Sequence, residues 1–215
     1  MRPLLVSIQQ NRTQGRSPYW GVPVARAIPA FVVAAYLTFT ENHSSQVSLF
    51  VFGSYAVVSG LFVAGLSARF VVERLTRRLF VLQGLIGVVL GAAALVFNTG
   101  GVPLFLYLVS LFGALTGFIE LYSGLRSRNS AVVEQRLLAK DWLAAGVFTA
   151  LLALVFLVIP LDVVTAIGLF GGYAVMLGLY LVIGGLSLRW GPQPTRHVSG
   201  TAPRTTESLN QETTS

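Results

Sequence analysis

The sequence predicts an all-α, polytopic membrane protein with six transmembrane helices, arranged as three helical hairpins. The first observation behind this prediction is the composition: of 215 residues, 54% are hydrophobic and 11% are charged, with a mean hydropathy of +0.72. Ordinary soluble domains contain about 25% charged residues, so a soluble enzyme or soluble binding module is disfavoured. The other two observations are the lengths of the apolar runs and the placement of the basic residues between them.

The apolar runs have the length of membrane spans. A helix needs about 20 apolar residues to cross about 30 Å of hydrocarbon. Five runs reach this length, at about 47–67, 79–97, 102–125, 142–160 and 163–188. A sixth run at about 21–40 contains Arg26 and Pro29. This segment can cross the membrane if the Arg26 side chain extends to the near interface and the carbonyl freed by Pro29 finds another hydrogen-bond partner. The alternative is that the segment is re-entrant or lies in the membrane interface.

The regions outside the spans differ in composition. Residues 1–19 are predicted to form a flexible basic arm, because their apolar stretch is shorter than the core of a signal peptide. Residues 20–190 form the predicted six-helix domain. Residues 191–215 are rich in Ser, Thr, Gln and Pro and hold too few apolar residues to bury a core. We expect them to form a disordered cytoplasmic tail.

The basic residues predict how the chain is threaded. Connections 41–46, 98–101 and 161–162 contain no Lys or Arg, whereas basic residues occupy the other connections and both terminal regions. Positive residues favour the cytoplasmic side, so both termini are predicted to be cytoplasmic, which requires an even number of spans. The net charge of +7 is therefore interpreted as a topology signal and not as a nucleic-acid-binding face.

An internal repeat supports the hairpin arrangement. The pattern Gly-Leu-x-x-Arg ends at Arg69, Arg128 and Arg189, at intervals of about 60 residues. The predicted hairpins are at about 20–69, 79–128 and 142–189. Each of these arginines follows a helix whose C-terminus has a negative partial charge, so we predict that they anchor the cytoplasmic interface and contact anionic lipid. Successive hairpins have the same orientation, unlike the inverted repeats of many transporters.

The third hairpin carries a family resemblance. It contains Trp142-Leu143-Ala144-Ala145-Gly146, an apolar helix ending at Val158-Ile159-Pro160, and then a helix with spaced glycines. This pattern resembles the HdeD family of short-repeat membrane proteins, over most of residues 20–190 and best at 142–189. The middle hairpin departs from it, with Asn98-Thr99-Gly100-Gly101 where the Pro would fall. The resemblance implies a bacterial inner-membrane protein associated with acid-stress resistance, and it brings no catalytic residue.

Glu120 is the only acidic residue well inside a predicted span. Gly113, Gly117 and Gly124 share its helical face, and small residues at such spacing let helices approach closely. Glu120 is therefore predicted to point into the bundle. Further packing glycines are expected at Gly84, Gly87, Gly91, Gly168 and Gly172.

Two partners and two roles are open for Glu120. Gln83 lies at a similar depth in the preceding helix, so we predict a Glu120–Gln83 hydrogen bond. The alternative partners are tyrosines, for which the candidates are Tyr36, Tyr55 and Tyr173. An intramembrane carboxyl can serve as a proton relay, or it can hold helices together.

Few residues remain that could carry chemistry. The chain has no Cys, and His43 and His197 are far apart, so neither a metal site nor a cofactor is predicted. We find no paired acids and no Ser beside a base within the spans, so we expect no enzyme. The leading hypothesis is a non-enzymatic protein contributing to acid or envelope stress tolerance. The alternative is a small transporter or channel with Glu120 in a proton or solute path. The glycine faces could also join copies of the chain, so a homo-oligomer is open.

Overall fold

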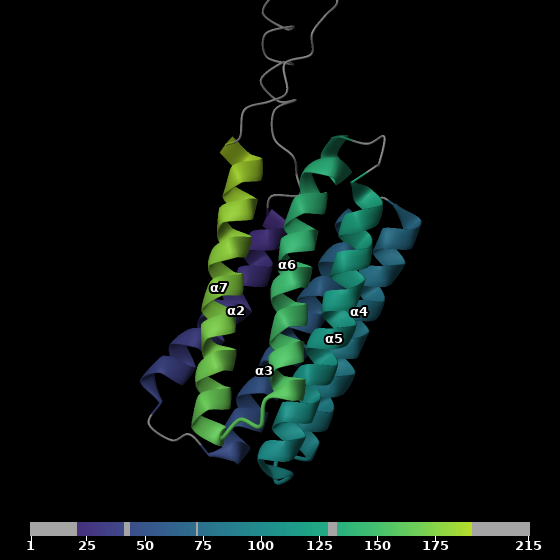
Figure 1. Ribbon diagram of the computed structural model, residues 1–215. Helices are drawn as coiled ribbons and strands as arrows, with labels where there is room; N and C mark the ends of the chain where they lie inside the picture. Colours follow the sequence, from purple (N-terminus) through teal and green to yellow (C-terminus); the bar gives the residue numbers. More distant parts are fainter. Residues whose placement is uncertain (1–20, 41–43, 72, 129–132, 191–215) are drawn as a thin grey trace, which may run out of the picture.

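The computed structural model describes residues 21–40, 44–71, 73–128 and 133–190. In this part of the chain every regular element is an α-helix, and the helices lie side by side in a bundle (Figure 1). The helices are α2 (Gly21–Phe39), α3 (Ser45–Phe70), α4 (Arg74–Val96), α5 (Gly101–Ser127), α6 (Val133–Val158) and α7 (Val163–Trp190). The predicted N-terminal arm and C-terminal tail lie outside the described residues.

The helices have the dimensions of a multi-pass membrane protein. Five of them, α3 to α7, are long and apolar enough to cross a membrane. The apolar part of α2 is shorter and runs from Pro23 to Phe39. The 19 residues of α2 still give a helix about 28 Å long, and Pro29 lies within it without interrupting it.

Several helices extend beyond the apolar runs that predicted them. The sequence predicted helices from about 79 and 142, but α4 begins at Arg74 and α6 begins at Val133. The segments between these predicted spans, at about 70–78 and 129–141, are therefore partly helical. The reason is that bilayer thickness limits the apolar length of a helix and not its total length, and Arg, Lys, Leu, Gln and Glu are all good helix formers.

The most extensive packing joins helices of different predicted hairpins. α3 packs mainly against α4, α5 against α6, and α7 against α2, while α2–α3, α4–α5 and α6–α7 contacts are smaller. The last described helix thus packs against the first described helix, and Figure 1 shows α2 and α7 as neighbours.

Glycines bring α3 and α4 together. A Cβ at Gly60 would lie 2.5 Å from the Gly84 carbonyl oxygen, and one at Gly91 would lie 2.7 Å from the Gly53 carbonyl oxygen. Both distances are shorter than a van der Waals contact, so neither site has room for a side chain. The predicted packing role of Gly84 and Gly91 is confirmed.

Glycines also line the α5–α6 contact. A Cβ at Gly113 would lie 3.0 Å from the Thr149 carbonyl oxygen, one at Gly117 would lie 2.9 Å from the Ala150 nitrogen, and one at Gly124 would lie 2.6 Å from Leu143 Cγ. The glycine face of α5 predicted from the sequence is therefore its contact with α6.

In α7 the prediction was wrong. A Cβ at Gly168 or Gly172 would meet no atom within 4 Å, whereas one at Gly178 would lie 3.1 Å from the Phe31 ring of α2. Since α7 is apolar on all sides, its sequence does not show which face is buried. The structure turns Gly178 toward α2.

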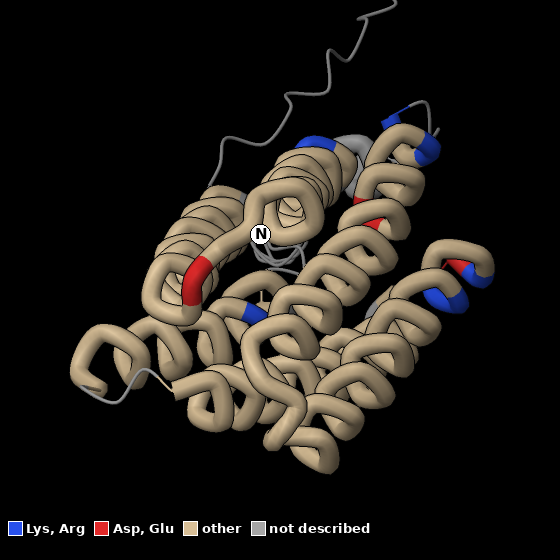
Figure 2. Tube along the Cα trace, turned by 60° about the horizontal axis from the view of Figure 1, so that its bottom comes forward, with Lys and Arg blue, Asp and Glu red and all other residues tan. Residues whose placement is uncertain are grey.

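The two ends of the bundle differ in charge. One end, here called the basic end, holds most of the described cationic residues, namely Arg69, Arg74, Arg77, Arg78, Arg126, Arg128 and Lys140. Figure 2 shows Lys and Arg gathered toward one end of the helices, with few charges along the rest. The opposite end, here called the apolar end, comprises the 97–100 turn, the 159–162 connection and the adjoining helix ends.

A cluster of five rings fills the core nearer the apolar end. It consists of Phe52, Phe105, Phe112, Phe156 and Phe170, here called the phenylalanine cluster. Its ring pairs meet edge to face, with centroids 5.7–6.3 Å apart, which is the favoured arrangement for aromatic rings. All five come from the half of their helix that lies nearer the apolar end.

Candidate functional site

A buried ion pair lies between α2 and α5. The Arg26 Nη2 atom donates to Glu120 Oε1 at 2.6 Å, and the two side chains are 13% and 3% exposed. The residues are 94 positions apart in the sequence, so only the closed packing of the bundle brings them together. Removing two charges from water costs several kcal/mol for each ion, and a close, hydrogen-bonded partner offsets that cost.

Gln83 of α4 completes the site. Its Nε2 atom donates to the same Glu120 oxygen at 2.9 Å, so the hydrogen bond expected from the depth of the two residues is present. One carboxylate oxygen therefore accepts from both α2 and α4. Gly146 of α6 also adjoins the site, because a Cβ there would lie 3.1 Å from Glu120 Cβ.

The structure corrects the expectation for Arg26. Its guanidinium group does not extend to the near interface but binds Glu120 inside the bundle. The physical reason is that an unpaired carboxylate at this depth would cost more than an ion pair. One sequence signal could have found the pair: Arg26 and Glu120 are oppositely charged residues within apolar runs, and charges inside a membrane usually pair with each other.

Hydroxyl groups lie beside the ion pair. The Tyr173 hydroxyl is 2.9 Å from Thr149 Oγ1, and the Tyr55 hydroxyl interacts with Ser59 and Tyr173. Both tyrosines are near enough to Arg26 and Glu120 to interact with them electrostatically. We call Tyr55, Ser59, Thr149 and Tyr173 the hydroxyl cluster.

The tyrosines were alternative partners for Glu120, and the structure places them differently. Within the described residues Glu120 bonds to Arg26 and Gln83 and to no tyrosine. Tyr55 and Tyr173 lie in the adjacent hydroxyl cluster, while Tyr36 is 48% exposed on α2. The cluster lies nearer the middle of the helices than Glu120 does, since Tyr55, Thr149 and Tyr173 are close to the centres of α3, α6 and α7.

Polar side chains also continue from the ion pair to the basic end. Glu120, Ser123 and Ser127 occupy successive turns of one face of α5, and all three are buried. The Ser123 and Ser127 hydroxyls and the Gln83 Oε1 atom have no hydrogen-bond partner within the described part of the chain. Buried polar atoms without partners are rare in folded proteins. The hydrogen-bonding capacity of the side chains between Glu120 and the basic end is therefore less fully used than that of the ion pair itself.

A second, exposed ion pair lies at the basic end. Glu73 Oε1 is 3.6 Å from Arg126 Nε, and Glu73 Oε2 accepts from the Thr76 hydroxyl at 2.8 Å. Since the Arg126 side chain is 48% exposed, this pair contributes little to stability.

The predicted interface anchors are at the basic end. Arg69 and Arg128 are exposed there, at the ends of α3 and α5. Arg189 lies in the last turn of α7, and its side chain is outside the described residues. His43 and His197 are also outside them. Among the residues that the structure describes, no three His, Cys, Asp or Glu side chains lie together as metal ligands would.

At the apolar end Asp162 caps α7. Its carboxylate accepts from the Val164 and Thr165 amides at 3.1 and 3.2 Å and from the Thr165 hydroxyl. The Thr165 hydroxyl, followed by the Thr165 amide, lowers the pKa of Asp162 below its ordinary value of 3.8. Asp162 is thus a helix cap in water and not a member of the buried site.

The comparisons with known proteins found no relative: no family model, no curated protein and no solved structure matches the chain. The functional argument therefore depends on the site itself. A Glu–Arg pair can lose its charge balance when the carboxylate takes up a proton. Its neighbours in the described chain are an amide and hydroxyl groups, which can form hydrogen bonds.

Proposed function

We propose that this protein is a non-enzymatic, multi-pass protein of a bacterial inner membrane, of the HdeD type, which contributes to acid or envelope stress tolerance. In this proposal all six helices cross the membrane as three parallel hairpin repeats. The basic end and both chain termini face the cytoplasm, where positive residues are favoured. Lipids, including anionic lipids near Arg69, Arg128 and Arg189, are the partners.

The observation that carries the proposal is the Arg26–Glu120 pair with its Gln83 neighbour. Arg26 is the charged residue that weakened the prediction of α2 as a membrane span. In the structure its guanidinium group is 2.6 Å from the Glu120 carboxylate. A paired arginine costs far less in a membrane than an isolated one. The pair therefore favours α2 as a span over a re-entrant or interfacial α2.

The same pair supports a role in acid stress. Through Glu120 the pair joins α2 to α5, and Gln83 joins α4 to the same carboxylate oxygen. An ion pair holds helices together only while both partners are charged. Such a link needs no catalytic residue.

Acid survival tests this role. Bacteria that lack their own proteins of this type would produce the wild type, Glu120→Gln or Glu73→Gln, with equal amounts of each in the membrane. We expect the wild type and Glu73→Gln to raise survival after acid challenge, because Glu73 belongs to the exposed pair. Glu120→Gln should leave survival at the level of cells without the protein. Equal protection by Glu120→Gln would contradict a role for the buried pair.

The second candidate function is a small transporter or channel with Glu120 in a proton or solute path. The hydroxyl cluster favours it, because Tyr55, Tyr173 and Thr149 continue the polar surroundings of Glu120 toward the middle of the bundle. The phenylalanine cluster argues against an open pore, because it fills the core beyond the hydroxyl groups.

Decay of an imposed pH gradient in proteoliposomes separates the two candidates. A protein-dependent proton flux that Glu120→Gln abolishes and Glu73→Gln retains would establish the transport function. No flux above that of empty liposomes, from a protein that is equally folded, would favour the non-transporting stress protein.

A further inference from the structure

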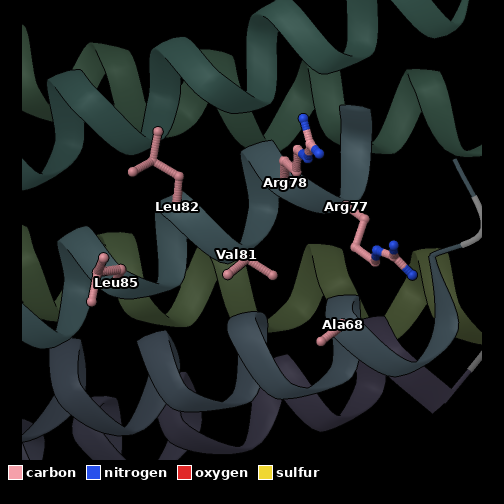
Figure 3. Close-up of a pocket in the computed structure, with 6 residues that line it drawn as sticks. All are labelled: Ala68, Arg77, Arg78, Val81, Leu82 and Leu85. Carbon is pink, nitrogen blue, oxygen red and sulfur yellow. The ribbon is translucent and has the colours of Figure 1, made fainter. Parts of the chain in front are cut away.

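We propose that a groove between α3 and α4 at the basic end binds one anionic phospholipid. The groove has a volume of about 410 Å³ and opens to the surface. Its lining residues are Ala68 of α3 and Arg77, Arg78, Val81, Leu82 and Leu85 of α4 (Figure 3). This inference rests on the proposed membrane placement of the basic end, and it adds a defined site and a ligand class.

Two arginines supply the polar part of the groove. Arg77 and Arg78 are exposed, and neither has an ion-pair partner in the described part of the chain. Glu73, the acidic residue just before α4, is engaged by Arg126 and Thr76. Among the residues that the structure describes, no carboxylate therefore balances the charge of the two guanidinium groups. Guanidinium groups match phosphate oxygens in geometry and charge.

The rest of the lining is apolar and is ordered along α4. Along α4, the two arginines are followed by Val81, Leu82 and Leu85, which lie progressively nearer the middle of the helix. Figure 3 shows these side chains along the same helix. Leu85 lies about 10 Å deeper than Arg78 along the helix axis. Cations at the membrane surface followed by apolar side chains at increasing depth match a phospholipid, whose phosphate lies at the surface and whose acyl chains extend inward.

A small residue leaves space for the lipid. Ala68 is the α3 contribution to the groove, and a larger side chain there would fill the space while leaving both arginines in place. An anionic lipid is favoured over a zwitterionic one, because the positive headgroup of the latter would face Arg77 and Arg78.

Lipid binding to the purified full-length protein tests the site. Native mass spectrometry would measure the apparent Kd for phosphatidylglycerol and for phosphatidylcholine with the same acyl chains, and glycerol phosphate would serve as a headgroup without chains. Arg77→Gln/Arg78→Gln removes the charges, and Ala68→Phe fills the groove. Lys140→Gln is the control, since it removes an exposed cation at the same end, outside the groove and away from the three predicted anchor arginines.

We expect the wild type to prefer phosphatidylglycerol. The double arginine variant should bind it about thirtyfold more weakly, Ala68→Phe should lose most of the binding, and Lys140→Gln should retain it. Equal weakening in Lys140→Gln would show diffuse charge attraction and overturn the site. Equal binding of phosphatidylcholine, or equally tight binding of glycerol phosphate, would overturn an anionic lipid as the occupant.

These outcomes do not depend on acid survival or proton flux. If labelling of single-cysteine variants placed the basic end outside the cytoplasm while the lipid result held, the proposed orientation would fail and the groove would stand. If the lipid result failed while Glu120→Gln still abolished acid protection, the proposed function would stand without this site.

Discussion

The bundle half nearer the apolar end is filled by aromatic rings, whereas the half nearer the basic end contains charges and partly unsatisfied polar groups. Phe52 meets Phe105, Phe112 and Phe170 edge to face, and no water or proton is needed to complete these contacts. Around Glu120, an ion pair and an amide occupy the interior instead. The first half is held by apolar packing that pH does not alter, and the second by an ion pair and its hydrogen bonds.

The ion pair gives the largest expected effect. Arg26→Met should destabilise the protein by about 4 kcal/mol, because it leaves Glu120 charged and unpaired in the interior. The double variant Arg26→Met/Glu120→Met should recover most of this loss, since apolar residues of similar volume often replace a buried pair without cost. Chemical unfolding in detergent micelles would measure both. A double variant as unstable as the sum of the two single variants would show that the side chains are not coupled.

The phenylalanine cluster gives the next effect. Phe52→Ala should cost about 3 kcal/mol, because it opens a cavity among rings that cannot fully collapse into it. The free energy of unfolding should fall by the same amount at pH 5 and pH 7. A pH-dependent loss for Phe52→Ala would contradict the separation of the two halves.

Glycine contacts give a smaller effect that tests helix packing. Gly60→Ala should destabilise the protein by about 2 kcal/mol, since the new Cβ would lie 2.5 Å from the Gly84 carbonyl oxygen. Gly65→Ala is the matched control on the same helix, because a Cβ there meets nothing within 4 Å. It should be neutral or stabilise α3 by up to about 1 kcal/mol. Thermal unfolding of the two variants side by side would measure the difference, and equal losses would mean that the α3–α4 contact is not close.

Substitution of Asp162, which caps α7 at the apolar end, should have the smallest effect on stability. Asp162 belongs neither to the phenylalanine cluster nor to the ion-pair site. Its pKa is below 3.8 because the Thr165 hydroxyl and the Thr165 and Val164 amides bond to the carboxylate. A lowered pKa means that the unfolded chain binds the proton first. The stabilisation is therefore present above pH 3.8 and is lost as the pH falls through the lowered pKa. Asp162→Asn should slightly lower the unfolding midpoint at neutral pH and leave it unchanged in strong acid.

The sequence predicts the helices and part of the site, for identifiable reasons. Long apolar runs permit little but helices in a membrane, and the depth of Gln83 and Glu120 follows from helical rise alone. Arg26 could not be matched to Glu120 by such counting, because their contact depends on how α2 closes against the bundle. The faces of α7 were likewise undetermined, since a helix that is apolar on all sides carries no signal for its rotation.

The charge state of Glu120 tests the central claim most directly. Infrared difference spectroscopy of the wild type and Glu120→Gln in lipid at neutral pH would isolate the signal of this one carboxyl group. The account predicts carboxylate stretching bands that disappear in Glu120→Gln and shift in Arg26→Met. A protonated carboxyl band in the wild type at neutral pH would contradict a buried Arg26–Glu120 ion pair.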